Sequence, residues 1–156
     1  MIKGLRVDHR LLHGQVAVSW FSSLDANTIL IANDDVAKDE FRKSAMRLAK
    51  PHNAKLVMKD LDYSIQAIKE GLTDKYDLFV VVESVQDAYR LIKETGAFKE
   101  LNLGGTKATS ETRNVSKAVN LSQDEEKLLD ELVSNGIEIE IRQVPNDKKL
   151  LYVDTK

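Results

Sequence analysis

The chain alternates between short runs of aliphatic residues and segments whose apolar residues recur at helical spacing. The unbroken apolar run 78–82 is typical of a central strand that is buried on both faces of a sheet. In 137–142 isoleucine alternates with charged residues, which indicates a half-exposed strand near a sheet edge. Strands are predicted over 2–8, 27–32, 54–58, 78–82, 100–103, 118–121 and 137–141.

Helices are predicted between most of these strands, over residues 15–24, 36–48, 63–72, 85–95 and 123–134. In 36–48 the prediction rests on Val36, Ala37, Phe41, Ala45 and Leu48, which follow helical spacing.

Capping residues support two of the helix boundaries. Ser84 is an expected N-cap, and its helix should end near Gly96. Ser122 and Glu125 have the spacing of a capping box, in which each side chain bonds the backbone of the other residue.

The alternation of strands and helices predicts a single α/β domain. We expect an open, mostly parallel sheet of about seven strands, one of them antiparallel, with helices on both faces. Residues 106–116 form a polar loop with no helix, so parallel order should break between the fifth and sixth strands. Ligands of such sheets bind beyond the carboxyl ends of the strands, which makes residues 8–14 the first place to look for chemistry.

Length and composition narrow the class of protein. The 156 residues fit one domain, and the absence of cysteine leaves no disulfide framework and no thiolate metal site. Basic and acidic residues, 23 and 25, nearly cancel, which argues against a nucleic-acid binder. No apolar run approaches the roughly 20 residues of a membrane span, and the start shows no signal-peptide pattern. We therefore expect a soluble cytoplasmic protein.

The loop after the first strand concentrates reactive side chains. It reads Arg6-Val7-Asp8-His9-Arg10-Leu11-Leu12-His13-Gly14-Gln15-Val16 and holds two of the three histidines. Imidazole is nucleophilic near neutral pH, and arginine binds phosphate oxygens through two donors. Free N–H groups at a helix start add a positive field, and a glycine there lets the backbone approach an anion. Asp8 is placed to orient an arginine or an imidazole.

Residue types alone leave this loop open to other interpretations. A loop histidine is usually a solvated side chain, and Arg6 and Arg10 would serve equally well as ordinary surface charges or in a salt bridge with Asp8. The pair Leu11-Leu12 either holds the loop to the domain or meets a partner protein.

Other candidates receive structural interpretations. His52 follows Pro51 in a connecting loop and is expected at the surface. Asp34-Asp35 would bind a cation, steer a basic partner or cap the next helix, and capping is the commoner use. Trp20 with Leu24 is expected in the core or at a dimer contact. Thr106, Lys107 and Thr109 follow Gly104-Gly105 and would approach the loop, without an assigned role.

The loop resembles the signature of the IIB components of the mannose–fructose–sorbose family of the bacterial sugar phosphotransferase system (PTS). That signature reads Arg-hydrophobic-Asp-X-Arg-Leu-hydrophobic-His-Gly-Gln-Val. Asn102-Leu103-Gly104-Gly105 is similar to the family's Asn-Val-Gly-Gly segment, and residues 135–144 are similar to its closing strand. Three separated segments in the expected order span nearly the whole chain, so the resemblance implies one IIB domain of the mannose/sorbose type over 1–156.

The resemblance implies a role for each loop residue. His13 would be the phosphorylated residue, modified at Nδ1, with Arg10 as the phosphate clamp and Asp8 at the family's acidic position. Arg6, Gly14 and Gln15 would support the loop or the phosphate. Position 9 varies in the family, so His9 is assigned no catalytic role.

The resemblance also implies an activity and partners. The activity would be that of a phosphohistidine–sugar phosphotransferase without a metal or other cofactor. A IIA protein would donate the phosphoryl group, and a sugar entering through the membrane components IIC and IID would accept it, at the inner face of the membrane. A homodimer is expected only from the family. Two other functions remain open: a non-catalytic anion-binding module and a regulatory docking domain.

Overall fold

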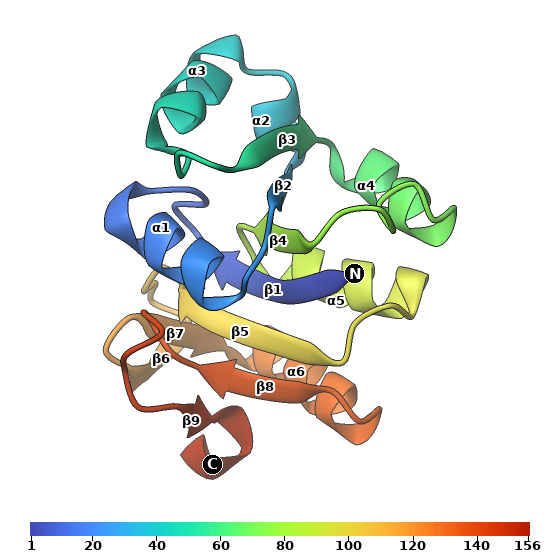
Figure 1. Cartoon of the computed structure of the whole chain (residues 1–156). Helices are drawn as coiled ribbons and strands as arrows, with labels where there is room; N and C mark the ends of the chain where they lie inside the picture. Colours follow the sequence, from blue (N-terminus) through green and yellow to red (C-terminus); the bar gives the residue numbers. More distant parts are fainter.

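The computed structural model describes all residues from Met1 to Lys156. Seven strands form one sheet in the order β3-β2-β4-β1-β5-β8-β9 (Figure 1). These strands are β1 (Ile2–Asp8), β2 (Thr28–Ala32), β3 (Lys55–Lys59), β4 (Leu78–Val82), β5 (Glu100–Gly105), β8 (Glu138–Ile141) and β9 (Leu150–Leu151). The helices are α1 (Gly14–Ser23), α2 (Asp34–Ala37), α3 (Glu40–Ala49), α4 (Leu61–Lys69), α5 (Val85–Thr95) and α6 (Gln123–Ser134), with a final 3₁₀ turn (Tyr152–Thr155).

All neighbouring strands of this sheet run parallel except β9, which pairs antiparallel with β8. The predicted α/β class and mostly parallel sheet are therefore confirmed. The antiparallel strand itself was not predicted, because a run of two leucines carries no strand periodicity.

Helices cover both faces of the sheet, and each face has its own core. A cluster of 24 buried residues joins the sheet to α4, α5 and α6. A second cluster of 13 residues joins the opposite face to α1, α2 and α3. The chain thus leaves β1 toward one face and leaves the adjacent β4 toward the other. This change of direction opens a crevice at the carboxyl ends of β1 and its neighbours, where α/β sheets bind ligands.

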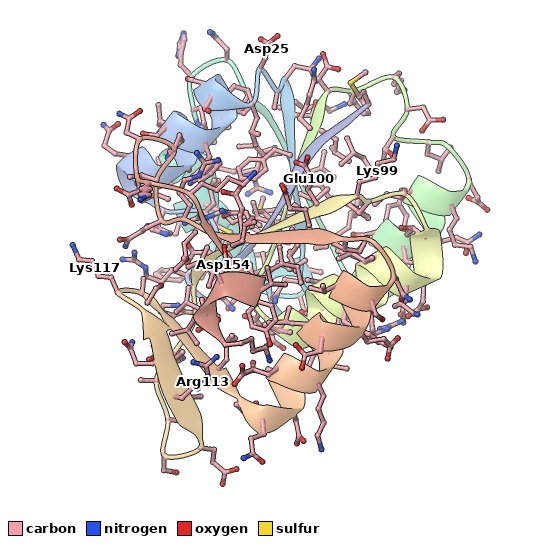
Figure 2. All side chains as sticks on the ribbon, turned by 90° about the horizontal axis from the view of Figure 1, so that it is seen from below. Asp25, Lys99, Glu100, Arg113, Lys117 and Asp154 are labelled. Atoms are coloured by element: carbon pink, nitrogen blue, oxygen red, sulfur yellow. The ribbon has the colours of Figure 1, made fainter.

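The link between β5 and α6 differs from the prediction. Its second half is a strand, β6 (Thr112–Ser116), which pairs antiparallel with β7 (Val119–Ser122). The predicted sixth strand therefore lies in a separate hairpin and not in the main sheet. Figure 2 shows this hairpin beside α6, with Lys117 at its turn and Arg113 on β6. The sequence does not reveal this strand, because β6 is half exposed and pairs with β7 alone, so most of its residues are polar.

The predicted helix 36–48 is two helices, because Lys38 and Asp39 interrupt it. Asn33 caps α2 by accepting from the Val36 N–H at 2.9 Å, and Asp39 caps α3 by accepting from the Arg42 N–H at 3.1 Å. Capping of α2 by Asp34-Asp35 was thus a wrong prediction. Asp34 instead accepts from the Leu61 N–H at the start of α4, at 2.9 Å.

The caps predicted for the later helices are confirmed. Ser84 accepts from the Asp87 N–H, and Gly96 ends α5 in the left-handed region at φ 63°. Ser122 and Glu125 form the reciprocal capping box of α6. None of the helices combines the length and the apolar character that crossing a membrane requires.

Candidate active site

The loop predicted to carry the chemistry joins the end of β1 to the start of α1. Asp8 is the last residue of β1 and is buried, and His13 is the N-cap residue of α1. Leu11 and Leu12 between them are also buried, at 3% and 5% exposure, so they hold the loop against the domain. Leu11 has a φ of +58°, a conformation that costs energy for a branched side chain and persists only where packing imposes it.

Asp8 organises the loop through three of its oxygens. Its backbone carbonyl accepts from the Leu11 N–H at 2.8 Å, and its Oδ1 accepts from the Arg10 N–H at 3.0 Å. Its Oδ2 accepts from Arg6 Nη2 at 3.1 Å and lies 2.9 Å from His13 Nε2. One buried carboxylate therefore fixes both the turn of the loop and the imidazole.

The charge of Asp8 determines the tautomer of His13. Burial would raise the pKa of Asp8, but the hydrogen bonds from His13 and the Arg10 N–H, together with the charge of Arg6, outweigh burial and lower it. The group is thus a carboxylate at neutral pH and can only accept hydrogen bonds. His13 Nε2 must then carry the proton, and a neutral His13 keeps its lone pair on Nδ1.

Arg6 supports Asp8 from within the sheet. Its Nη1 donates to Asn102 Oδ1 at 2.6 Å and to the Arg142 carbonyl at 3.2 Å, and that carbonyl also accepts from Asn102 Nδ2 at 3.2 Å. A Cβ at position 104 would lie 2.0 Å from Arg6 Cζ, so glycine is required there. The Asn102–Gly105 segment therefore binds the Arg6 guanidinium: Asn102 accepts a hydrogen bond from it, and Gly104 leaves room for it. Arg6 belongs to the support of the loop and is itself buried.

Trp20 of α1 ties this support to the edge of the sheet. Its ring lies 5.4 Å from Arg6 Cζ and 5.1 Å from Arg142 Cζ, distances typical of cation–π contacts. Its Nε1 donates to the Gln143 carbonyl at 2.9 Å. The expectation that Trp20 is a core residue is confirmed, since it is 4% exposed. Its contact with Arg6 and Arg142 was not predicted, because residues 6, 20 and 142 are far apart in sequence.

Three residues of the loop, Arg10, Gly14 and Gln15, face solvent. Arg10 is exposed, and its side chain makes no hydrogen bond or ion pair within the chain, so its guanidinium is free to bind an anion. Gly14 begins α1 with a φ of +47° and open space around it, and Gln15 is exposed beside it. The first N–H groups of α1 have no partner within the helix and so point a positive field toward the loop.

His9 lies on another side of the loop. Its N–H donates to the Gly105 carbonyl at 3.0 Å, and its Nδ1 is buried with no hydrogen-bond partner. With Thr106, Lys107 and Thr109 it lines a cleft of about 460 Å³ that no hydrophobic residue lines. The structure thus brings the Thr106–Thr109 segment to His9, beside the loop.

His52 and the acidic side chains that were considered as metal ligands do not belong to this site. His52 is exposed in the turn before β3, as expected. No group of three or more His, Asp or Glu side chains is arranged to hold a metal ion.

Comparison with known proteins identifies the family of this chain. The family model for the PTS system sorbose subfamily IIB component matches residues 2–154. The IIBSor domain of the sorbose permease from Klebsiella pneumoniae superposes with a TM-score of 0.92 at 27% identity, over 99% of this chain and 95% of that one. The fold is thus that of a PTS IIB domain.

Curated relatives agree with this class. The fructose-specific EIIB component of Bacillus subtilis is 28% identical over 91% of this chain and 87% of its own length. The sorbose-specific EIIB component of Lacticaseibacillus casei is 30% identical over the same shares. The mannose-specific EIIAB component of Escherichia coli is 28% identical over 99% of this chain. The matched region makes up 48% of that longer protein. The chain belongs to the sorbose subfamily of PTS IIB components, whose members act as phosphotransferases.

Proposed function

We propose that this chain is a phosphoryl carrier in which His13 Nδ1 takes the phosphoryl group. The observation that carries the proposal is the contact of His13 Nε2 with the buried carboxylate of Asp8 at 2.9 Å. This contact supports a proton on Nε2 and therefore a free lone pair on Nδ1 for the attack. The His13 side chain is 21% exposed, so a partner can reach it while the loop still fixes its orientation.

In the first step, His13 Nδ1 attacks the phosphorus of a donor phosphohistidine. The Nδ1–P bond forms while the donor's N–P bond breaks, and the donor imidazole leaves. The His13 ring gains positive charge because Nε2 keeps its proton, and the Asp8 carboxylate stabilises that charge. Phosphoryl transfer asks a protein mainly for such positioning and charge stabilisation.

The exposed end of the loop supplies positive charge for the phosphoryl oxygens. The Arg10 guanidinium is always charged and offers paired donors, and the first N–H groups of α1 begin at His13. Arg6 is already bound to Asp8 and Asn102, so it holds the carboxylate and does not reach for the phosphate.

In the second step, a sugar hydroxyl oxygen attacks the phosphorus of phospho-His13. The O–P bond forms, the Nδ1–P bond breaks, and the hydroxyl proton passes to a base or to solvent. We propose a IIA protein as donor, in keeping with the Escherichia coli relative whose name joins A and B components. The acceptor is a sugar delivered by membrane components of the IIC and IID type, at the cytoplasmic face of the membrane. Relatives are named for fructose, sorbose and mannose, and a similar solved structure is named for N-acetylgalactosamine, so the proposed sugar class covers hexoses and N-acetylhexosamines.

The proposal is tested by phosphorylating the protein from phosphoenolpyruvate through the general PTS proteins and a IIA component. We expect one acid-labile, base-stable phosphate per chain, absent in His13→Ala. His9→Ala and His52→Ala are the matched controls and should keep the label. Full labelling of His13→Ala overturns the assignment, and anion binding without covalent phosphate supports a binding module instead.

A further inference from the structure

Helix α3 turns its apolar side away from the core. Phe41 and Leu48 are 85% and 91% exposed, whereas Met46 on the other side is 6% exposed. Phe41, Ala45 and Leu48 follow the spacing i, i+4 and i+7, which places all three on one face of a helix. We call this exposed side, defined by these three residues, the α3 face. An exposed pair of large apolar side chains on one helix face calls for a partner.

Cations surround the α3 face. Lys38 precedes the helix and Lys50 follows it, while Arg42 and Arg47 fall on either side of the apolar residues at 100° per residue. None of these four side chains has an ion pair within the chain. Of the acidic residues at the start of α3, Asp39 caps the helix, and Glu40 pairs with Lys43 at 3.6 Å while its side chain stays 79% exposed.

The place of α3 in the molecule favours a broad partner. Figure 1 shows α3 at one end of the molecule, beyond the edge strand β3, so the helix lies at the periphery of the fold. An apolar helix face with flanking Lys and Arg is the pattern of helices that lie in the interface of an anionic bilayer. A second copy of the chain would instead bring the same cations face to face.

We propose that the α3 face docks on an anionic lipid surface, with Phe41 and Leu48 inserted among the acyl chains and the four cations among the headgroups. α3 and α1 cover the same face of the sheet, so docking would hold the His13 loop near the membrane. The contact is weak and reversible, because only two large apolar side chains enter the bilayer. It does not depend on the chemistry of His13.

The test is cosedimentation of the full chain with vesicles of phosphatidylglycerol and phosphatidylcholine, against vesicles of phosphatidylcholine alone, at low ionic strength. We expect binding to the anionic vesicles that weakens with salt. The double variant Phe41→Ser/Leu48→Ser should lower the partition coefficient at least about tenfold. Arg42→Gln/Arg47→Gln should also lower it and should reduce its salt dependence.

Leu72→Ser is the matched control, because Leu72 is 56% exposed but lies beyond α4, away from the α3 face. It should bind like the unaltered chain. Absence of binding to anionic vesicles, or equal losses for Leu72→Ser and the double variant, overturns the proposal. A dimer in size-exclusion chromatography that the double variant abolishes assigns the α3 face to a second copy and also overturns it. The double variant should still accept phosphate on His13, so failure here is distinct from failure of the carrier function.

Discussion

His13 Nε2 lies 2.9 Å from the Oδ2 atom of Asp8, five residues earlier at the end of β1. The loop between them has to turn back on itself, and Leu11 takes a left-handed conformation to do so. The burial of Leu11 and Leu12 and the hydrogen bonds of Asp8 offset the backbone strain at Leu11. The relationship makes Asp8 a positioning residue for His13 as well as a counter-charge.

Asp8→Asn should slow phosphorylation of His13. The neutral amide no longer stabilises the positive ring that forms as Nδ1 takes the phosphorus, and it no longer imposes one tautomer. We expect the rate to fall about 100-fold, the size of effect seen when one fixed electrostatic partner is lost. Rapid-quench measurement of phosphate transfer from a phosphorylated IIA donor gives the rate.

Circular dichroism of Asp8→Asn should first establish that the variant is folded under the assay conditions. An unchanged rate in folded protein would show that Asp8 only shapes the loop. In the unaltered chain, nitrogen–phosphorus coupling in NMR should place the phosphate on Nδ1, and a phosphate on Nε2 would contradict the tautomer assignment.

Arg10→Lys should impair transfer without changing stability. The Arg10 side chain is exposed and makes no hydrogen bond or ion pair within the folded chain. Lysine keeps the charge but not the paired donors, so we expect a rate about 10-fold lower, and about 100-fold lower for Arg10→Gln. The urea midpoint should stay within error. A shifted midpoint, or a normal rate in Arg10→Gln, would contradict a phosphate-binding role.

Much of the fold was predictable because strands buried on both faces leave continuous apolar runs. Leu78–Val82 and the strand–helix alternation were enough to give the α/β class. The sequence could not reveal β6, whose polar residues pair only within a hairpin, or β9, which has two residues. In α3 the helical spacing is real, but spacing alone does not tell that Phe41 and Leu48 face outward.

The site was predicted only as far as the loop is local in sequence. Asp8, Arg10 and His13 are neighbours along the chain, so residue chemistry and the family signature could group them. The contacts of Arg6 with Asn102 and the Arg142 carbonyl bridge separations of 96 and 136 residues. Such long-range pairs follow from strand order, which the sequence does not state. The Asn-x-Gly-Gly segment was the one available signal, since a polar residue and two glycines are unusual in a buried strand.

Gly104→Ala should destabilise the protein through Arg6. The added Cβ would lie 2.0 Å from Arg6 Cζ and would push the guanidinium away from Asp8 and Asn102. We expect a loss of about 3 kcal/mol in the free energy of unfolding, at the upper end for overpacking, because a buried charge network is displaced. Gly105→Ala is the matched control, since its Cβ would meet nothing closer than 3.5 Å. Equal urea midpoints for the two variants would contradict the conclusion that position 104 must leave room for the Arg6 guanidinium.

Acid should remove the stability that Asp8 contributes. Burial raises the pKa of Asp8, but the hydrogen bonds from His13 and the Arg10 N–H and the charge of Arg6 lower it by more than burial raises it. The pKa of Asp8 in the folded chain therefore lies below that of an unfolded aspartate, about 3.9. A lowered folded pKa gives stability that is complete above the unfolded pKa and is lost as pH falls through the folded pKa. The difference in free energy of unfolding between the unaltered chain and Asp8→Asn should therefore be constant near neutral pH and shrink below about pH 4. Urea denaturation across this pH range measures the difference in free energy of unfolding. The control is Glu111→Gln, at an exposed position, for which this difference should not shrink in acid. A difference that widens in acid would mean that the environment of Asp8 favours its protonated form in the folded protein, and the tautomer assigned to His13 would then lose its basis.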